Sequence, residues 1–221
     1  MLAHRGEWTE APENSLAAFE AAAQSPWLDG VEFDVRGARD GTPVVIHDPD
    51  LRRVQGVAGR VADLTTTELR DRGVPLLGSV LEALPAPCFL DVELKEDLAA
   101  QVVPLLARAR GDPPAQTVVS SFLPSAIESV RRIAPGWPTW LIHLELDERV
   151  VARAVALGCV GIAAEWLALR PAGVALTRDA GLQLATWTVE DRSALDTVLQ
   201  YDLDAICFDP GGFSARSEGE V

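Results

Sequence analysis

The sequence predicts an α/β fold, a (β/α)8 TIM barrel with a small β-hairpin and loop inserted after the second strand. Eight short apolar runs recur along the 221 residues and alternate with helix-like segments, which is the order expected of eight βα units. Polar side chains collect where these runs end, and active sites of such barrels lie at that end of the strands. A doubly wound open sheet is the structural alternative.

The elements follow from short apolar runs and from helical periodicity. Barrel strands are expected at 2–4, 31–35, 89–94, 117–121, 139–143, 160–164, 184–188 and 205–208. Helices are expected at 15–24, 65–72, 79–84, 98–110, 125–134, 147–157, 171–180 and 192–201. Asn14 or Ser15 is the expected cap of the first helix.

The inserted hairpin is predicted from the short distance between two apolar runs. Seven residues with an Asp40-Gly41 turn signal separate the strand at 31–35 from a further strand at 43–47. A parallel crossover needs a dozen residues or more, so this pair is expected to be antiparallel. Residues 1–213 are expected to form a single domain, with 214–221 as a flexible tail.

Composition excludes several classes of protein. The net charge of −14 argues against a protein that neutralises nucleic-acid phosphates with lysine and arginine. Cys88, Cys159 and Cys207 are odd in number and widely spaced, which favours buried free thiols in a reducing compartment. With no signal-like or membrane-spanning stretch, we expect a cytoplasmic protein without stable membrane insertion. The oligomeric state stays open.

Two acids two residues apart in an apolar strand are the most informative feature. Glu32 and Asp34 share one face of the strand, because alternate side chains point the same way. Two adjacent carboxylates repel, and a hard metal ion with oxygen ligands relieves that repulsion. Glu93 lies in a second strand with the same alternating pattern. The alternative is a pair of antiparallel surface strands with one wet face.

Histidines and basic residues accompany these acids at the strand ends. His4 and His47 end strands toward the same rim, where one imidazole can take a proton while the other donates one. Arg5 and Lys95 supply positive charge for an anionic group such as phosphate, or they simply form ion pairs in a polar barrel mouth. His143 lacks such neighbours, and a structural role is expected for it.

These residues resemble the ordered signature of glycerophosphodiester phosphodiesterases. The resemblance rests on motifs in matching order and spacing, and it covers nearly the whole chain. The motifs are His4-Arg5-Gly6, Pro12-Glu13-Asn14-Ser15, Glu32-x-Asp34-Val35, Val44-Val45-Ile46-His47-Asp48, Leu51-x-Arg53, Glu93-Leu94-Lys95, Ser121-Phe122 and Trp187-Thr188-Val189.

The resemblance implies metal-dependent hydrolysis of a glycerophosphodiester to sn-glycerol 3-phosphate and an alcohol. It implies that Glu32, Asp34 and Glu93 bind one divalent cation, Ca²⁺ or Mg²⁺. His4 and His47 would then be the acid/base pair, and Arg5 and Lys95 would bind the substrate phosphate. Glu13, Glu165 and Trp187 are candidates for pocket or supporting residues.

Two other functions remain open, a phospholipase D-like lyase that releases a cyclic phosphate and a non-catalytic barrel that binds phosphoesters. The chain also departs from the family pattern in places that affect substrate choice. The segment from Leu69 to Val74 is shorter than in many relatives, which predicts a more open pocket.

Overall fold

A closed barrel of parallel strands forms the centre of the protein. The computed structural model describes residues 1–211, so the predicted tail at 214–221 lies outside the described residues. Within 1–211, eight parallel strands pair in a ring that closes because β1 pairs with both β9 and β2. These are β1 Leu2–His4, β2 Gly30–Gly37, β4 Phe89–Leu94, β5 Thr117–Ser121, β6 Thr139–His143, β7 Gly161–Glu165, β8 Gln183–Val189 and β9 Ala205–Phe208. The predicted (β/α)8 barrel is confirmed.

The hairpin after the second barrel strand is also confirmed. Strand β3, Pro43–Val45, pairs antiparallel with β2 and places Val45 opposite Val35. Gly41 has φ of 78° in the connecting turn, a conformation that glycine adopts without steric cost. Although β3 ends two residues earlier than predicted, the Ile46 amide still donates to Asp34 O at 2.9 Å. This hydrogen bond keeps the chain beside β2 for one residue beyond β3, and His47 follows directly after it.

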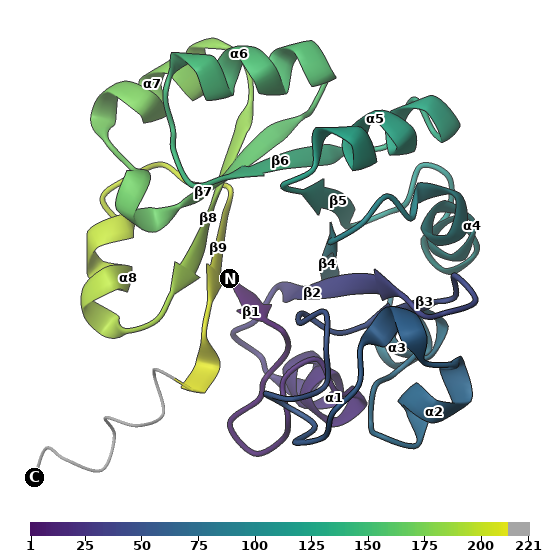
Figure 1. The fold of residues 1–221 in the computed structure, drawn as a ribbon. Helices are drawn as coiled ribbons and strands as arrows, with labels where there is room; N and C mark the ends of the chain where they lie inside the picture. Colours follow the sequence, from purple (N-terminus) through teal and green to yellow (C-terminus); the bar gives the residue numbers. More distant parts are fainter. Residues whose placement is uncertain (212–221) are drawn as a thin grey trace, which may run out of the picture.

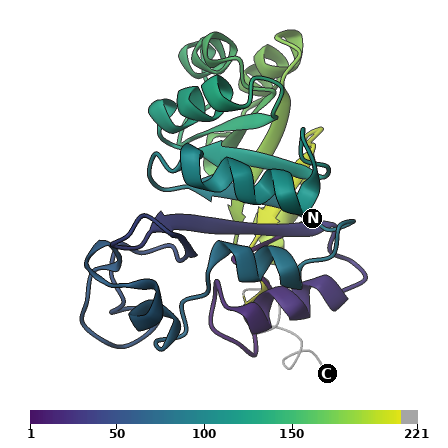
Figure 2. The same cartoon turned by 90° about the vertical axis from the view of Figure 1, so that its right-hand side faces the viewer.

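Helices cover the outside of the strand ring, as Figure 1 shows. They are α1 Leu16–Gln24, α2 Thr66–Arg70, α3 Leu77–Ala83, α4 Ala99–Arg110, α5 Pro124–Ile133, α6 Glu148–Leu157, α7 Pro171–Asp179 and α8 Arg192–Val198. The Ser15 hydroxyl accepts from the Ala18 amide at 3.2 Å, which identifies Ser15 as the cap of α1. The blue segment with α2 lies beyond one end of β2 in Figure 2, beside the hairpin.

Two short helical turns were not predicted. They are the 3₁₀ segments η1 Val61–Asp63 and η2 Trp166–Ala168. Three residues are too few to carry a helical period, so the sequence gives no signal for them. Helix α8 ends at Val198, three residues before its predicted end at Tyr201.

The main core lies between the strands and the helices. Val31, Phe33 and Val35 are fully buried on the outer face of β2, and Phe33 meets Phe19 of α1 edge-on at 5.6 Å between ring centroids. The alternate residues Glu32 and Asp34 therefore face the barrel interior. This is the division between the two faces that the sequence predicted.

Two further properties concern the surface and the thiols. Within residues 1–211, none of the helices combines the length and the apolar character needed to cross a bilayer. Cys159 and Cys207 are buried free thiols, whereas Cys88 is only half-buried, contrary to the expectation for all three.

Candidate active site

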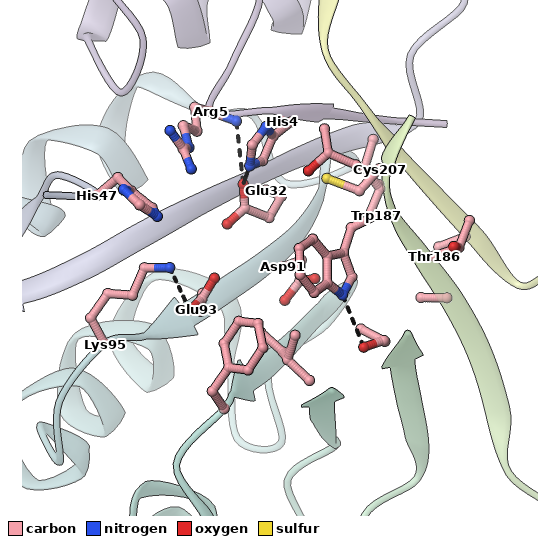
Figure 3. Close-up of a pocket in the computed structure, with 17 residues that line it drawn as sticks. His4, Arg5, Glu32, His47, Asp91, Glu93, Lys95, Thr186, Trp187 and Cys207 are labelled. Carbon is pink, nitrogen blue, oxygen red and sulfur yellow. Dashed lines mark hydrogen bonds and ion pairs between the residues drawn. The ribbon is translucent and has the colours of Figure 1, made fainter. Parts of the chain in front are cut away.

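A pocket of about 290 Å³ opens at the ends of the barrel strands and brings together most of the predicted site residues (Figure 3). Its histidine, arginine, lysine and carboxylate side chains come from β1, β2, β4 and the segments that follow β1, β3 and β4. These residues are His4, Arg5, Glu32, His47, Asp91, Glu93 and Lys95. The position agrees with the rule that barrel sites form at the carboxyl ends of the strands.

Three carboxylates converge at this pocket. The parallel register of β2 and β4 places Asp34 beside Glu93. One carboxylate oxygen from each of Glu32, Asp34 and Glu93 lies within 4.8 Å of the others, and all three side chains are buried. Oxygen Oε1 of Glu32 is buried without a hydrogen-bond partner. A set of hard oxygen donors with an unsatisfied member fits Ca²⁺ or Mg²⁺.

Lys95 and Arg5 balance only part of this negative charge. Lys95 Nζ lies 2.9 Å from Asp34 Oδ1 and 2.6 Å from Glu93 Oε1, and Arg5 Nε lies 3.3 Å from Asp34 Oδ2. Burial opposes ionisation of Asp34, yet Lys95 and Arg5 outweigh it and lower the pKa of that carboxyl.

The other two ligand candidates are electrostatically unfavourable as they stand. Burial and the neighbouring charge of Asp34 raise the pKa of Glu93 to about 7. Burial, Asp34 and Glu93 also raise the pKa of Glu32 well above its usual range. A bound cation would offset both effects, so the charge distribution favours cation binding.

Both histidines are held by carboxylates at the same ring nitrogen. His4 Nδ1 is 2.5 Å from Asp209 Oδ1, and His47 Nδ1 is 2.7 Å from Asp48 Oδ1. A carboxylate at Nδ1 keeps the proton there, which leaves Nε2 of each ring for chemistry. His4 Nε2 lies 3.8 Å from Glu32 Oε2, beside the carboxylates. Sequence reasoning gave neither Asp209 nor Asp48 a role.

Arg53 connects Glu13, the partner of Arg5, with Asp48, the partner of His47. Sequence reasoning also missed this role of Arg53. Its guanidinium binds both carboxylate oxygens of Glu13, at 2.6 and 2.7 Å, and both of Asp48, at 2.7 and 3.1 Å. Glu13 in turn accepts from Arg5 at 2.9 Å. One arginine therefore positions the partner of His47 and the partner of Arg5. Its place in the sequence motif was the signal that could have found it.

Replacing Arg53 by alanine is expected to lower kcat about tenfold, because Asp48 and Glu13 lose the group that fixes them. Arg53→Lys should recover only part of the loss, since an ammonium cannot bind two carboxylates in the planar bidentate manner. Steady-state kinetics on Arg53→Ala and Arg53→Lys, with the exposed neighbour variant Arg52→Ala as control, measure the effect. Equal kcat in Arg53→Ala and wild type would refute this positioning role.

Two buried polar residues add to the site without having been predicted. Asn14, at φ of 55°, donates from Nδ2 to Asp34 Oδ2 at 2.9 Å. Asparagine tolerates that left-handed conformation better than most residues, so it suits this position. Asp91 lines the pocket and accepts from the Ser120 hydroxyl at 2.5 Å. Burial raises the pKa of Asp91 to about 7.

The remaining candidates separate into residues near the pocket and residues away from it. Trp187 lines the pocket and packs edge-on against Phe122 at 5.4 Å, and Glu13 lies behind Arg5. Glu165 lines a different depression with Leu144 and Leu167, so it does not join the other site residues. His143, for which a structural role was expected, accepts at Nδ1 from the Glu145 amide at 3.0 Å.

Comparison with known proteins gives consistent matches. The model of the glycerophosphoryl diester phosphodiesterase family matches residues 4–85 and 78–211. The chain is 26% identical over 229 residues to a glycerophosphodiester phosphodiesterase of Caldanaerobacter subterraneus, covering 95% of this chain and 93% of the relative. It is 28% identical over 230 residues to a probable glycerophosphodiester phosphodiesterase 1 of Mycobacterium tuberculosis, covering 89% and 84%. An Oleispira antarctica phosphodiesterase, solved with the product sn-glycerol-3-phosphate, superposes with a TM-score of 0.86 at 25% identity, covering 96% and 93%.

Proposed function

This chain belongs to the glycerophosphoryl diester phosphodiesterase family and is an enzyme of that class, and we propose that it hydrolyses glycerophosphodiesters to sn-glycerol 3-phosphate and an alcohol with one divalent cation. The convergence of three buried carboxylates beside two carboxylate-held histidines carries the proposal. Neither feature is needed to fold a barrel, and together they supply charge stabilisation and proton transfer at one place.

Glu32, Asp34 and Glu93 would hold the cation, which would supply charge stabilisation for the phosphoryl oxygens. Arg5 lies beside this cluster and lines the pocket, so its guanidinium can hydrogen-bond a phosphoryl oxygen. Lys95 bridges Asp34 and Glu93 and also lines the pocket, where its ammonium keeps the two carboxylates in place and adds positive charge.

His4 and His47 would move the protons. Burial lowers the pKa of His47 and favours its neutral imidazole, so Nε2 can take the proton from the attacking hydroxyl group. His4, held at Nδ1 by Asp209, would then give a proton to the departing alcohol oxygen. Where the attacking hydroxyl is the substrate's own glycerol hydroxyl, water would open the resulting cyclic phosphate to sn-glycerol 3-phosphate, with the two histidines in reversed roles. In each step, the carboxylate at Nδ1 stabilises the imidazolium that carries the proton.

Phosphorus NMR of the reaction products tests this function. Incubation of glycerophosphoglycerol with the protein and Ca²⁺ or Mg²⁺ is expected to yield sn-glycerol 3-phosphate, and excess chelator is expected to stop the reaction. A cyclic phosphate as the final product would instead assign lyase chemistry. No turnover of glycerophosphoglycerol or of the glycerophosphodiester of methanol with either cation would contradict an enzymatic role for the site.

A further inference from the structure

The pocket has two chemically different halves. Among the described lining residues, the histidine, arginine, lysine and carboxylate side chains come from β1, β2 and β4 and from the segments that follow β1, β3 and β4. In addition to Thr186, Trp187, Thr188 and Cys207, the opposite wall, from β6 to β9, contributes Ile142, Ala163, Ala185 and Ala205. Strand register places these four side by side, with Ile142 opposite Ala163, Ala163 opposite Ala185, and Ala185 opposite Ala205. They define what we call the alanine recess.

The alanine recess exists because the side chains there are small. Barrel interiors are normally filled by valine, isoleucine and leucine, which close the space between opposite strands. Trp140 and Val118 fill part of the barrel interior here, but the three alanines on three adjacent strands still line the pocket that contains the catalytic residues. The recess is therefore placed to hold part of the molecule whose phosphate lies at the carboxylates.

Two of the polar side chains near the recess, Thr186 and Trp187, are already bonded within the protein. The Trp187 indole nitrogen donates to Ala163 O at 3.0 Å, and the Thr186 hydroxyl donates to Ala164 O at 2.9 Å. These two donors are not free for a ligand, so the part of the wall made by Ile142 and the three alanines presents mainly carbon atoms, with Thr188 and Cys207 as its polar neighbours. A hydroxyl or a charge placed against it would lose its hydration without compensation.

We propose that the alanine recess binds the alcohol part of the substrate, and that the preferred substrates are glycerophosphodiesters of small, uncharged, apolar alcohols. The inference rests on the proposed phosphodiesterase function. Glycerol is the less suitable occupant, because its two free hydroxyls would face an apolar wall. The pocket volume of about 290 Å³, at the lower end for small-molecule sites, limits the alcohol to about six carbon atoms.

A pair of substrates of equal shape tests the chemistry of the recess. Glycerophosphocholine and the glycerophosphodiester of 3,3-dimethylbutanol differ in one atom, a quaternary nitrogen against a quaternary carbon. The dimethylbutyl diester, whose alcohol part is uncharged, is expected to have a kcat/KM at least about tenfold higher than glycerophosphocholine. The reason is that burying the ammonium group of choline is costly. Asp91 also lines the pocket and is the carboxylate that could pair with choline. Equal rates or a preference for choline would overturn the inference.

Narrowing the recess tests its location. The readout is the kcat/KM for the dimethylbutyl diester divided by the kcat/KM for the glycerophosphodiester of methanol (the methyl ester). Ala185→Val is expected to lower this ratio about tenfold. The same substitution at exposed Ala156 on α6 is the matched control and should leave the ratio unchanged. If thermal melting shows that Ala185→Val does not fold, Ala205→Val takes its place. An unchanged ratio in a folded recess variant would overturn the inference.

The same assays separate the two proposals. If wild-type protein with Ca²⁺ or Mg²⁺ cleaves neither the methyl ester nor glycerophosphoglycerol, the proposed phosphodiesterase function fails. If it cleaves both esters of the shape-matched pair at equal rates, only the role of the alanine recess fails.

Discussion

Replacement of His47 by alanine is expected to lower kcat by about 10²–10⁴-fold, the usual contribution of a positioned acid or base. His47 lines the pocket, and Asp48 fixes its Nδ1 at 2.7 Å, so the side chain is oriented for proton transfer. The variant should still bind the cation, because the three carboxylates are unchanged. Steady-state kinetics at saturating substrate, with cation affinity measured by calorimetry, separate these two effects.

His143 provides a matched control for this experiment. It also ends a barrel strand, β6, but it is not among the residues that line the pocket. His143→Ala should therefore keep wild-type kcat. His4→Ala is expected to lose activity as His47→Ala does, and wild-type rates in both variants would show that the proposed proton carriers are wrong.

Glu32→Gln is expected to abolish turnover and yet stabilise the metal-free protein. Loss of one carboxylate ligand should lower cation affinity at least about 100-fold. In the metal-free protein, burial and the neighbouring carboxylates raise the pKa of Glu32, so its charge is unfavourable in the folded state. Removing that charge is expected to raise the free energy of unfolding by about 1 kcal/mol. This would raise the melting temperature at pH 8 by about 2–4 °C.

The gain in stability should depend on pH in a defined direction. A carboxyl with a raised folded pKa binds its proton more tightly in the folded state, so its contribution to stability falls as pH rises above the unfolded pKa. Glutamine lacks this effect, and the difference between Glu32→Gln and wild type should grow from pH 4 to pH 8. Thermal melts in excess chelator measure it, with exposed Glu20→Gln on α1 as control. A lower melting temperature for Glu32→Gln at pH 8 would contradict the electrostatic account.

Much of this site could be predicted because strand periodicity decides which side chains share a face. Once Val31 and Phe33 are assigned to the core, Glu32 and Asp34 must face the barrel interior. A parallel neighbour in register then brings Glu93 beside them. Local sequence rules also gave the hairpin that carries His47, because seven residues cannot make a parallel crossover.

The missed residues depend on long-range contacts that no local pattern encodes. Asp209 reaches His4 across 205 positions of the sequence, because closing the barrel brings β9 beside β1. Arg53 lies 40 positions from Glu13, and the loop after the hairpin brings the two together. The alanine recess likewise requires the register of four strands, which the sequence alone does not give.

The location of a bound cation tests the central claim most directly. Crystals grown with Mn²⁺ in place of Ca²⁺ or Mg²⁺ would give an anomalous difference map of the site. We predict one strong peak with carboxylate oxygens of Glu32, Asp34 and Glu93 at about 2.0–2.6 Å, the range for hard divalent cations and oxygen. A peak elsewhere in the protein, or an empty cluster in crystals of an enzyme that the same cation activates, would contradict the claim.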